Sequence, residues 1–546
     1  MATLSLGVAA PALAAEPAFP LGGPSAQVLQ PYPDTGAPKE RSLRYDLSYV
    51  GPGNSFPGEF TITVDLSKVA GVASVRLDPA KPRANCTASA TAIVCKQQGL
   101  SVGNGSNSFD LLVSAAQGSK NGASGAIAVT GKVAGASVTP VTTKMTVGGP
   151  DLLVGELKLK ADVTAGEQQD LPLAFANRGT LPARSVALEL DTSAGLEPAE
   201  TYDNCRRQDH GGMGDTTVCL VEGEFLPGES YQLAPDSPLH LKTTERAYRD
   251  TLRYGVIPDP APSKDAPAGK SATGKKLTLV KASAAVPVTE SNLDPRVARR
   301  AEDTDLNPRD NERSFDFDAK GAKADFEAVT ASPSGKVGDT VVAELGFRNK
   351  GPAVISHLRS GQSVARADIV MPAGVQVTDV PRNCRAVNAD GSDRAEQLGA
   401  PRYFCDGGLF ADVPGTYASR FAMKIEKAVA NAKGSVTVGE PVPGGTKQHA
   451  FDPVAGNTTA AFVVEVKSGA SPSPSASASA SPSPSASASA SATPSASSST
   501  TAAGGTGGNL ASTGSSVGPV ALGALAAVAV GGALYVGVRR RSGGHA

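Results

Sequence analysis

Six cysteines restrict how this chain can fold, because they recur as three similar pairs. Each pair opens with an Asn-Cys dipeptide and closes with a cysteine after a short apolar strand: Asn85-Cys86 with Val94-Cys95, Asn204-Cys205 with Val218-Cys219, and Asn383-Cys384 with Phe404-Cys405. The loops between partners lengthen from copy to copy, whereas their ends keep their character, as in a hairpin held at its base. Six cysteines allow fifteen pairings, but sequential pairing keeps each bond within one repeat. We therefore predict the disulfides Cys86–Cys95, Cys205–Cys219 and Cys384–Cys405.

An alternating strand precedes the cysteines in each copy. In copies two and three it covers residues 171–175 and 341–347, and both strands end in a Phe-x-Asn-basic-Gly motif, residues 175–179 and 347–351. Copy one has a comparable strand at residues 60–66. A period of two places alternate side chains on one face of a sheet, and the glycine of the motif is expected to supply the positive φ of a turn.

The composition agrees with short strands joined by turns. The 546 residues include 60 Gly and 41 Pro but no Trp, which favours strands and turns over long helices. The expected fold class is all-β, with tandem antiparallel β-sandwiches followed by an unstructured stalk and one C-terminal transmembrane helix. The formal net charge of −1 gives no reason to expect a nucleic-acid partner.

The carboxyl end has three parts. Leu510, Ala511, Ser512, Thr513 and Gly514 precede an apolar run at residues 517–538, which is followed by Arg539, Arg540 and Arg541. The run is long enough at about 1.5 Å per residue to cross a ~30 Å hydrocarbon core as a helix. The arginines should stay on the cytoplasmic side, so the rest of the chain faces outward.

The amino end also indicates export. Residues 4–10 form a short apolar core, and Ala12 and Ala14 flank a small-x-small cleavage site, so residues 1–14 are predicted to be a signal peptide. Because no Lys or Arg precedes the apolar core, we expect the true start to lie upstream. Residues 15–40, rich in Pro, Ala and Gly, are predicted to be a disordered leader. An exported chain meets an oxidising compartment, which favours disulfides over a thiolate metal site.

Residues 469–509 consist almost entirely of Ser, Ala, Pro, Thr and Gly. Such a tract has no apolar groups able to offset the entropy of ordering. If extended, it would reach on the order of 100 Å at ~3.1 Å per residue. We interpret it as a disordered wall-spanning linker.

The three-part carboxyl end resembles the cell-wall sorting signal of Gram-positive surface proteins, whose usual form is Leu-Pro-x-Thr-Gly (LPXTG). With Ala511 in place of the proline, it looks like the variant handled by class E sortases of actinobacteria. The resemblance implies that a sortase cuts between Thr513 and Gly514 and joins Thr513 to peptidoglycan. The precursor would be held in the membrane only until it is sorted.

The Phe-x-Asn-[Arg/Lys]-Gly motif and the closing Asp452-Pro453…Asn457-Thr458 resemble immunoglobulin-like repeats of bacterial surface proteins. The resemblance covers residues 150–468 well and 41–149 loosely. It implies three immunoglobulin-like domains: residues 41–149, residues 150–320 with an insertion at 230–305, and residues 321–468.

Motifs that would carry chemistry are weak. The histidines, His210, His240, His357, His449 and His545, do not form a metal-ligand pattern, and neither a nucleophile elbow nor a P-loop is present. Asp303-x-Asp305-x-Asn307 begins like a calcium loop, but Pro308 and Ser314 replace the required glycine and acid, so a turn is expected there. The loop at residues 206–212 could be a displayed binding tip, although a solvated loop is the simpler interpretation. The absence of Trp argues against an aromatic platform for carbohydrate binding, and no isopeptide motif is found.

We therefore expect no catalytic residues, no cofactor and no bound metal. The expected function is surface display, adhesion or structure at the cell wall, with sortase and peptidoglycan as partners and an extracellular ligand left open. One alternative is a single-pass membrane-held binding protein with the same ectodomain. A second is a wall-associated enzyme whose site the sequence does not reveal.

Overall fold

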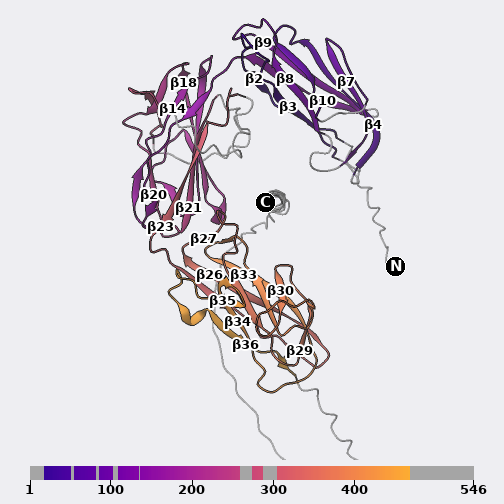
Figure 1. The fold of residues 1–546 in the computed structure, drawn as a ribbon, viewed down its shortest axis with the longest axis vertical. Helices are drawn as coiled ribbons and strands as arrows, with labels where there is room; N and C mark the ends of the chain where they lie inside the picture. The colour runs from indigo at the N-terminus through magenta and orange to yellow at the C-terminus, as the bar shows by residue number, and fades with distance from the viewer. Residues whose placement is uncertain are drawn as a thin grey trace, which may run out of the picture. The chain divides into compact units, whose positions relative to one another are not determined.

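The computed structural model describes residues 18–50, 55–80, 85–101, 108–133, 136–258, 274–286 and 304–467. The described part is all-β: it contains strands and two short 3-10 turns, Gly211–Met213 and Ala455–Asn457, and no α-helix (Figure 1). None of its elements is a helix that could cross a membrane. The predicted signal peptide, the predicted linker at 469–509 and the predicted sorting signal with its apolar run all lie outside the described residues.

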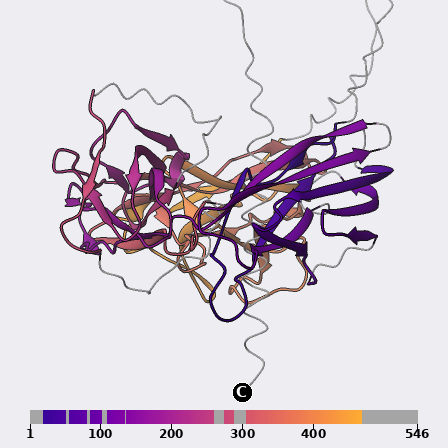
Figure 2. The same cartoon turned by 90° about the horizontal axis from the view of Figure 1, so that it is seen from above.

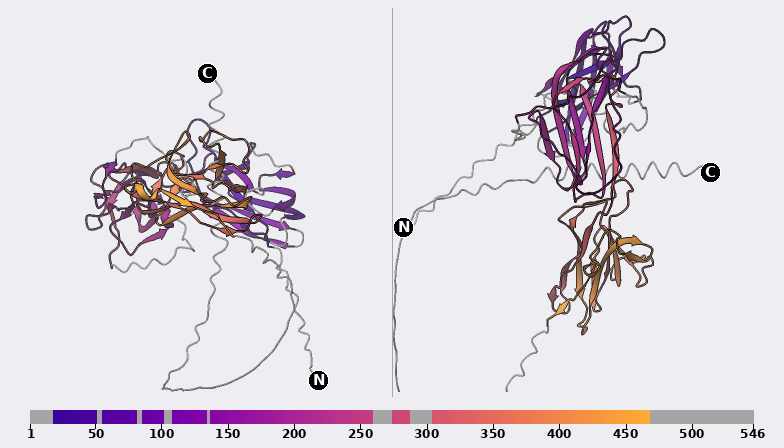
Figure 3. Two further views of the ribbon diagram at one scale, coloured as in Figure 1. Left: turned by 90° about the horizontal axis from the view of Figure 1, so that it is seen from below. Right: turned by 90° about the vertical axis from the view of Figure 1, so that its left-hand side faces the viewer.

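The buried apolar residues gather into three separate cores, at residues 19–147, 152–317 and 324–462. We call the corresponding parts of the chain modules 1, 2 and 3. Each core takes its side chains from strands of more than one sheet, and Figures 2 and 3 show the strands of each module from further directions.

Module 1 is built from two sheets. The four-stranded sheet has the order β1 (Leu21–Gly22), β3 (Arg41–Leu47), β8 (Ser108–Ala115), β5 (Ala73–Leu77). The six-stranded sheet has the order β2 (Ala26–Leu29), β10 (Ala136–Val147), β9 (Ser124–Val133), β4 (Ser55–Lys68), β7 (Ala92–Ser101), β6 (Cys86–Ala88). The predicted alternation at residues 60–66 holds, because Phe60, Ile62, Val64 and Leu66 are all buried.

Module 2 repeats this plan with an additional small sheet. Its four-stranded sheet has the order β11 (Leu152–Val154), β14 (Ala174–Asn177), β19 (Ser230–Leu233), β22 (Leu279–Lys281). The six-stranded sheet has the order β12 (Asp162–Val163), β23 (Glu312–Ala319), β21 (Arg249–Pro258), β15 (Ala183–Thr192), β18 (Asp215–Phe225), β17 (Cys205–Asp209). The small sheet has the order β13 (Gln168–Asp170), β20 (His240–Thr243), β16 (Leu196–Pro198).

Module 3 again pairs a four-stranded with a six-stranded sheet. The first has the order β24 (Ala324–Val329), β26 (Thr340–Pro352), β33 (Gly415–Ile425), β29 (Val375–Asp379). The second has the order β30 (Cys384–Val387), β31 (Arg402–Asp406), β28 (Arg366–Val370), β34 (Gly434–Val442), β35 (Gly445–Lys447), with β36 (Thr459–Phe462) also on β34. Two short pairs complete it: β25 (Ser334–Gly335) with β37 (Glu465–Val466), and β27 (Ile355–Ser356) with β32 (Phe410–Ala411).

The cysteine hairpin occupies the same place in all three modules. Its first strand, β6, β17 or β30, lies at the edge of the six-stranded sheet, and the two cysteines stand directly opposite each other in the strand register. The bonds are Cys86–Cys95, Cys205–Cys219 and Cys384–Cys405, the predicted pairs. Each disulfide therefore fastens an edge strand to its neighbour.

Two sequence-based expectations are wrong. Residues 15–40 were expected to be disordered, but β1 and β2 lie there, and β2 pairs in parallel with β10 while Leu29 is fully buried. These strands have two and four residues, too few for an alternation to stand out between Pro and Gly. Residues 230–305 were expected to be an insertion, but β21 lies between β15 and β23 inside the sheet. Its buried Leu252, Tyr254 and Val256 follow the strand period, which the charged and Pro-rich flanks concealed.

The glycine of the repeated motif also differs between copies. Gly351 has φ +88°, as predicted for the turn, whereas Gly179 does not have a positive φ. At Gly179 a side chain would not fit, because an added Cβ would lie 2.2 Å from the carbonyl oxygen of Gly149. Glycine is therefore required at the two positions for different reasons.

Candidate functional site

The predicted sorting residues, Leu510 to Gly514, lie outside the described residues, as do Arg539 to Arg541 and the cleavage-site residues Ala12 and Ala14. The cysteines that were singled out are all disulfide-bonded. One partner of each pair, Cys95, Cys219 or Cys405, is buried in a module core. These bonds are structural, and the cysteines offer no free thiol for catalysis or metal binding.

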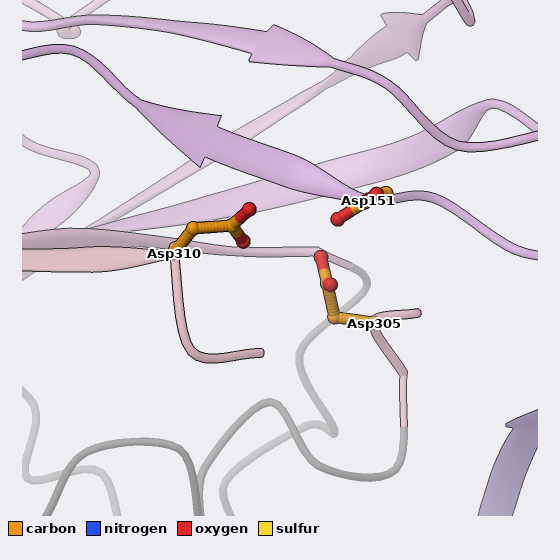
Figure 4. Close-up of side chains that lie close together, drawn as sticks. All are labelled: Asp151, Asp305 and Asp310. Atoms are coloured by element: carbon orange, nitrogen blue, oxygen red, sulfur yellow. The ribbon is translucent and has the colours of Figure 1, made fainter. Parts of the chain in front are cut away.

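Three carboxylates converge in module 2. Asp151 immediately precedes β11, whereas Asp305 and Asp310 lie in the turn that leads into β23. One oxygen from each carboxylate lies within 4.8 Å of the others, and Figure 4 shows the three side chains directed toward one another. The cluster thus joins residues that are far apart in the sequence.

Asp305 is the fixed member of this cluster. Its side chain is completely buried, at 0 % exposure. One carboxylate oxygen accepts the N–H of Leu152 (2.8 Å) and the amide of Asn311 (3.0 Å), and the other accepts the N–H of Asn307 (2.7 Å). Asp305 therefore ties the closing turn of module 2 to the start of its first strand.

Asp151 and Asp310 are less completely satisfied. Asp310 Oδ2 accepts a hydrogen bond from Asn307 Nδ2 (2.7 Å), but Asp310 Oδ1 and Asp151 Oδ1 are both buried without a hydrogen-bond partner. The pKa of Asp305 and that of Asp310 are raised to about 7, mainly by burial, and the nearby Asp151 contributes to the value of Asp310. Burial also raises the pKa of Asp151, although Arg178, Lys39 and Arg41 act in the opposite direction.

Module 3 contains the same arrangement with one difference. Asp452 accepts the N–H of Phe326 (3.0 Å) and of Val454 (2.9 Å), as Asp305 accepts those of Leu152 and Asn307. Asp325 lies in β24, one residue before Phe326, as Asp151 lies one residue before Leu152. The third position is Asn457, whose amide donates to Asp325 Oδ1 (2.6 Å). Asp310 stands where module 3 has this amide.

Sequence reasoning found only part of this cluster. It considered Asp303-x-Asp305-x-Asn307 as one continuous calcium loop and favoured a turn there, and Asp303 lies outside the described residues. Asp151 was missed because it is far away in the sequence. The signal for Asp310 is the alignment of Asp305…Asp310 with Asp452…Asn457, in which an acid stands in place of an amide.

Two other polar groups are internally satisfied. His240 lies between Asp170 (3.2 Å) and Glu200, within the small sheet of module 2. In the hairpin tip at residues 206–212, Arg207 pairs with Asp215, and His210 hydrogen-bonds Thr216 (3.0 Å). Both arrangements are contacts within module 2.

Comparison with known proteins does not assign a family. No family model matches the chain, and no curated protein matches it. Among solved structures, the I-band fragment I67-I69 from titin aligns at 8 % identity and a TM-score of 0.17, over 83 % of this chain and 99 % of that one. Alpha-2-macroglobulin of E. coli aligns at 10 % identity and 0.17, over 67 % and 20 % of the two chains, and the Yersinia pseudotuberculosis adhesin InvE at 11 % and 0.13, over 48 % and 57 %. TM-scores this low support no argument about function.

Proposed function

We propose that this chain is a cell-wall surface protein for display, adhesion or structural support, joined to peptidoglycan by a sortase after cleavage between Thr513 and Gly514. The observation that carries the proposal is the order of three features at the carboxyl end: the Leu510–Gly514 pentapeptide, the apolar run at 517–538 and the arginines at 539–541. Each feature would serve one step of sorting. The apolar run halts export, the arginines fix the orientation in the membrane, and the sortase recognises the pentapeptide.

Other features are consistent with this role. Three disulfides indicate an oxidising compartment. The all-β modules would be immunoglobulin-like sandwiches, carried outward by the linker at 469–509. The protein itself has no catalytic activity in this proposal, and its one reaction is as the substrate of a sortase, of class E by its Ala511.

The test is mass analysis of the C-terminal peptide from protein that muramidase releases from purified walls. We expect a peptide that ends at Thr513 and carries a peptidoglycan fragment. Thr513→Ala should abolish wall release, whereas Ser512→Ala, at the variable position of the signal, should not. A peptide that runs through Arg541 and is found only in membranes would refute sorting and favour the membrane-held binding protein.

A further inference from the structure

The carboxylates of Asp151, Asp305 and Asp310 present an electrostatic problem. Three like charges with oxygens within 4.8 Å repel one another, and burial weakens the screening by water. Such a group is stable only if it binds protons, pairs with cations or holds a metal ion. The cationic side chains near Asp151 do not outweigh its burial, because its pKa is still raised.

Module 3 shows how the same turn is built without this problem. There the Asn457 amide supplies a hydrogen to Asp325 (2.6 Å), and Lys350 lies 3.5 Å from the other oxygen of that carboxylate. In module 2 the corresponding Asp310 carboxylate has no hydrogen to give when ionised. The Asn457 Oδ1 atom is itself buried without a hydrogen-bond partner, so the two turns differ in one respect: the change from amide to acid removes a hydrogen-bond donor and adds a like charge.

Buried carboxylate oxygens of the cluster lack hydrogen-bond partners. Asp151 Oδ1 and Asp310 Oδ1 are buried without hydrogen-bond partners. Asn311 is 3 % exposed, and its Nδ2 donates to Asp305 Oδ2 (3.0 Å) and to the carbonyl of Val256 (2.9 Å). The Asn311 Oδ1 atom of this same amide is also buried without a partner. Buried acceptors are rarely left unsatisfied, so these oxygens need a hydrogen-bond donor or a cation.

We propose that Asp151, Asp305 and Asp310 bind a calcium ion that joins the closing turn of module 2 to the start of β11. All of these ligands are oxygens, as a hard cation requires, and neither His nor Cys belongs to the group. Calcium accepts six to eight oxygens in flexible geometry, with water completing the shell, whereas magnesium demands a near-ideal octahedron. The ion would take the place of the hydrogen that the Asn457 amide donates in module 3 and that an ionised Asp310 lacks.

The experiment uses the full oxidised chain, stripped with EDTA and titrated with CaCl₂ by calorimetry, with thermal unfolding followed in parallel. We expect one ion per chain, with a dissociation constant on the order of 10⁻⁴ M, weaker binding of MgCl₂, and a higher unfolding temperature for module 2 in calcium.

Asp310→Asn is the decisive variant, because it gives module 2 the residue that module 3 already has at Asn457. It should fold, weaken calcium binding at least about tenfold, and be more stable than the wild type in EDTA. Asp151→Asn should weaken binding as well. Asp162→Asn removes a charge from an exposed acid paired with Lys320 in the same module, and it should leave binding unchanged.

Three results would overturn the proposal. The first is a wild-type chain that neither binds calcium nor gains stability in it at about 10 mM, well above the range of weak calcium sites. The second is calcium binding that is unchanged in Asp310→Asn, and the third is tighter binding of magnesium than of calcium. If calcium has no effect while stability falls as pH rises through about 7, the carboxylates share protons instead of a metal ion.

Discussion

Asn177 and Asn349 make the same hydrogen bonds in two different modules. Each amide donates to the carbonyl oxygen four residues ahead, at Leu181 (3.0 Å) or Ala353 (2.9 Å). Each also donates to a distant strand end, at Phe225 (2.8 Å) or Ala411 (3.0 Å). In both, the side-chain oxygen accepts the N–H two residues ahead at 2.9 Å. This asparagine of the repeated motif is therefore a fixed connector between strands.

Replacing this connector should destabilise one module. Asn349 is 1 % exposed, so Asn349→Ala leaves two carbonyls and one N–H without partners in the interior, at a cost of about 3 kcal/mol. Hydrogen-exchange mass spectrometry should show faster exchange in peptides of module 3 and no change in module 1. Asn388→Ala removes hydrogen bonds near the surface and serves as the control. Equal effects of the two substitutions would contradict the buried role.

Removing the disulfides should have similar effects in the three modules. The paired cysteines are 9, 14 and 21 residues apart, and the entropy of closing loops changes only slowly with length, so each bond should contribute about 3 kcal/mol. Double substitutions of each pair to alanine, compared by urea denaturation, should give losses within about 1 kcal/mol of one another. A substantially larger loss for Cys384–Cys405 would show that the closed-loop argument is incomplete.

His449 should make module 3 sensitive to acid. The ring is 5 % exposed, stacks on Phe451 at 4.5 Å and has a buried Nε2 without a partner. Burial, with a smaller contribution from His357, lowers its pKa from 6.5 to about 4. Because the folded-state pKa is the lower one, the unfolded chain binds more protons between these values. The stabilisation is therefore complete above pH 6.5 and is lost as pH falls toward 4, by up to about 3 kcal/mol.

The measurement is the difference in unfolding free energy between the wild type and His449→Phe, which keeps an aromatic ring but cannot titrate. The difference should be constant above pH 7 and should move against the wild type as pH falls toward 4. A difference that does not change with pH would mean that His449 titrates normally in the folded protein.

Asn457→Asp should create the carboxylate surplus in module 3. The substitution removes the hydrogen bond to Asp325 Oδ1 and adds a like charge, so stability in EDTA should fall by about 2 kcal/mol. Calcium should restore part of this loss, to a limited extent because Lys350 already lies near Asp325. Denaturant unfolding with and without CaCl₂ makes the comparison. No loss of stability in EDTA would show that the amide is not needed there.

Much of the strand pattern could be predicted from the sequence, for physical reasons visible in particular residues. Val341, Leu345 and Phe347 alternate along β26 and are all buried, because one face of the strand meets a core. The strand expected at residues 171–175 is only partly found, since Leu171 and Leu173 are buried but lie between β13 and β14. The disulfide pairs were also predictable, since neighbouring strands in a hairpin hold sequential cysteines opposite each other. Local periodicity and local pairing are what a sequence shows directly.

The sequence-based predictions failed where a structural feature depends on contacts between residues that are far apart in the sequence. β2 is recognisable as a strand only through its parallel pairing with β10, and β21 through its place between β15 and β23. The Asp151–Asp305–Asp310 cluster depends on where the fold returns a later turn to an early strand. A motif search along the chain examines neighbouring residues, so it could not bring Asp151 and Asp305 together.

The position of the disulfides has a mechanical consequence. When the two ends of a module are pulled apart, tension enters the cysteine hairpin at one sulfur and leaves at the other, so it bypasses the backbone between Cys205 and Cys219 or their counterparts. The residues enclosed by each bond carry no load and add nothing to the contour length of a stretched chain. A hairpin tip relieved of force in this way is free to vary in length and sequence, and its length does differ in all three modules.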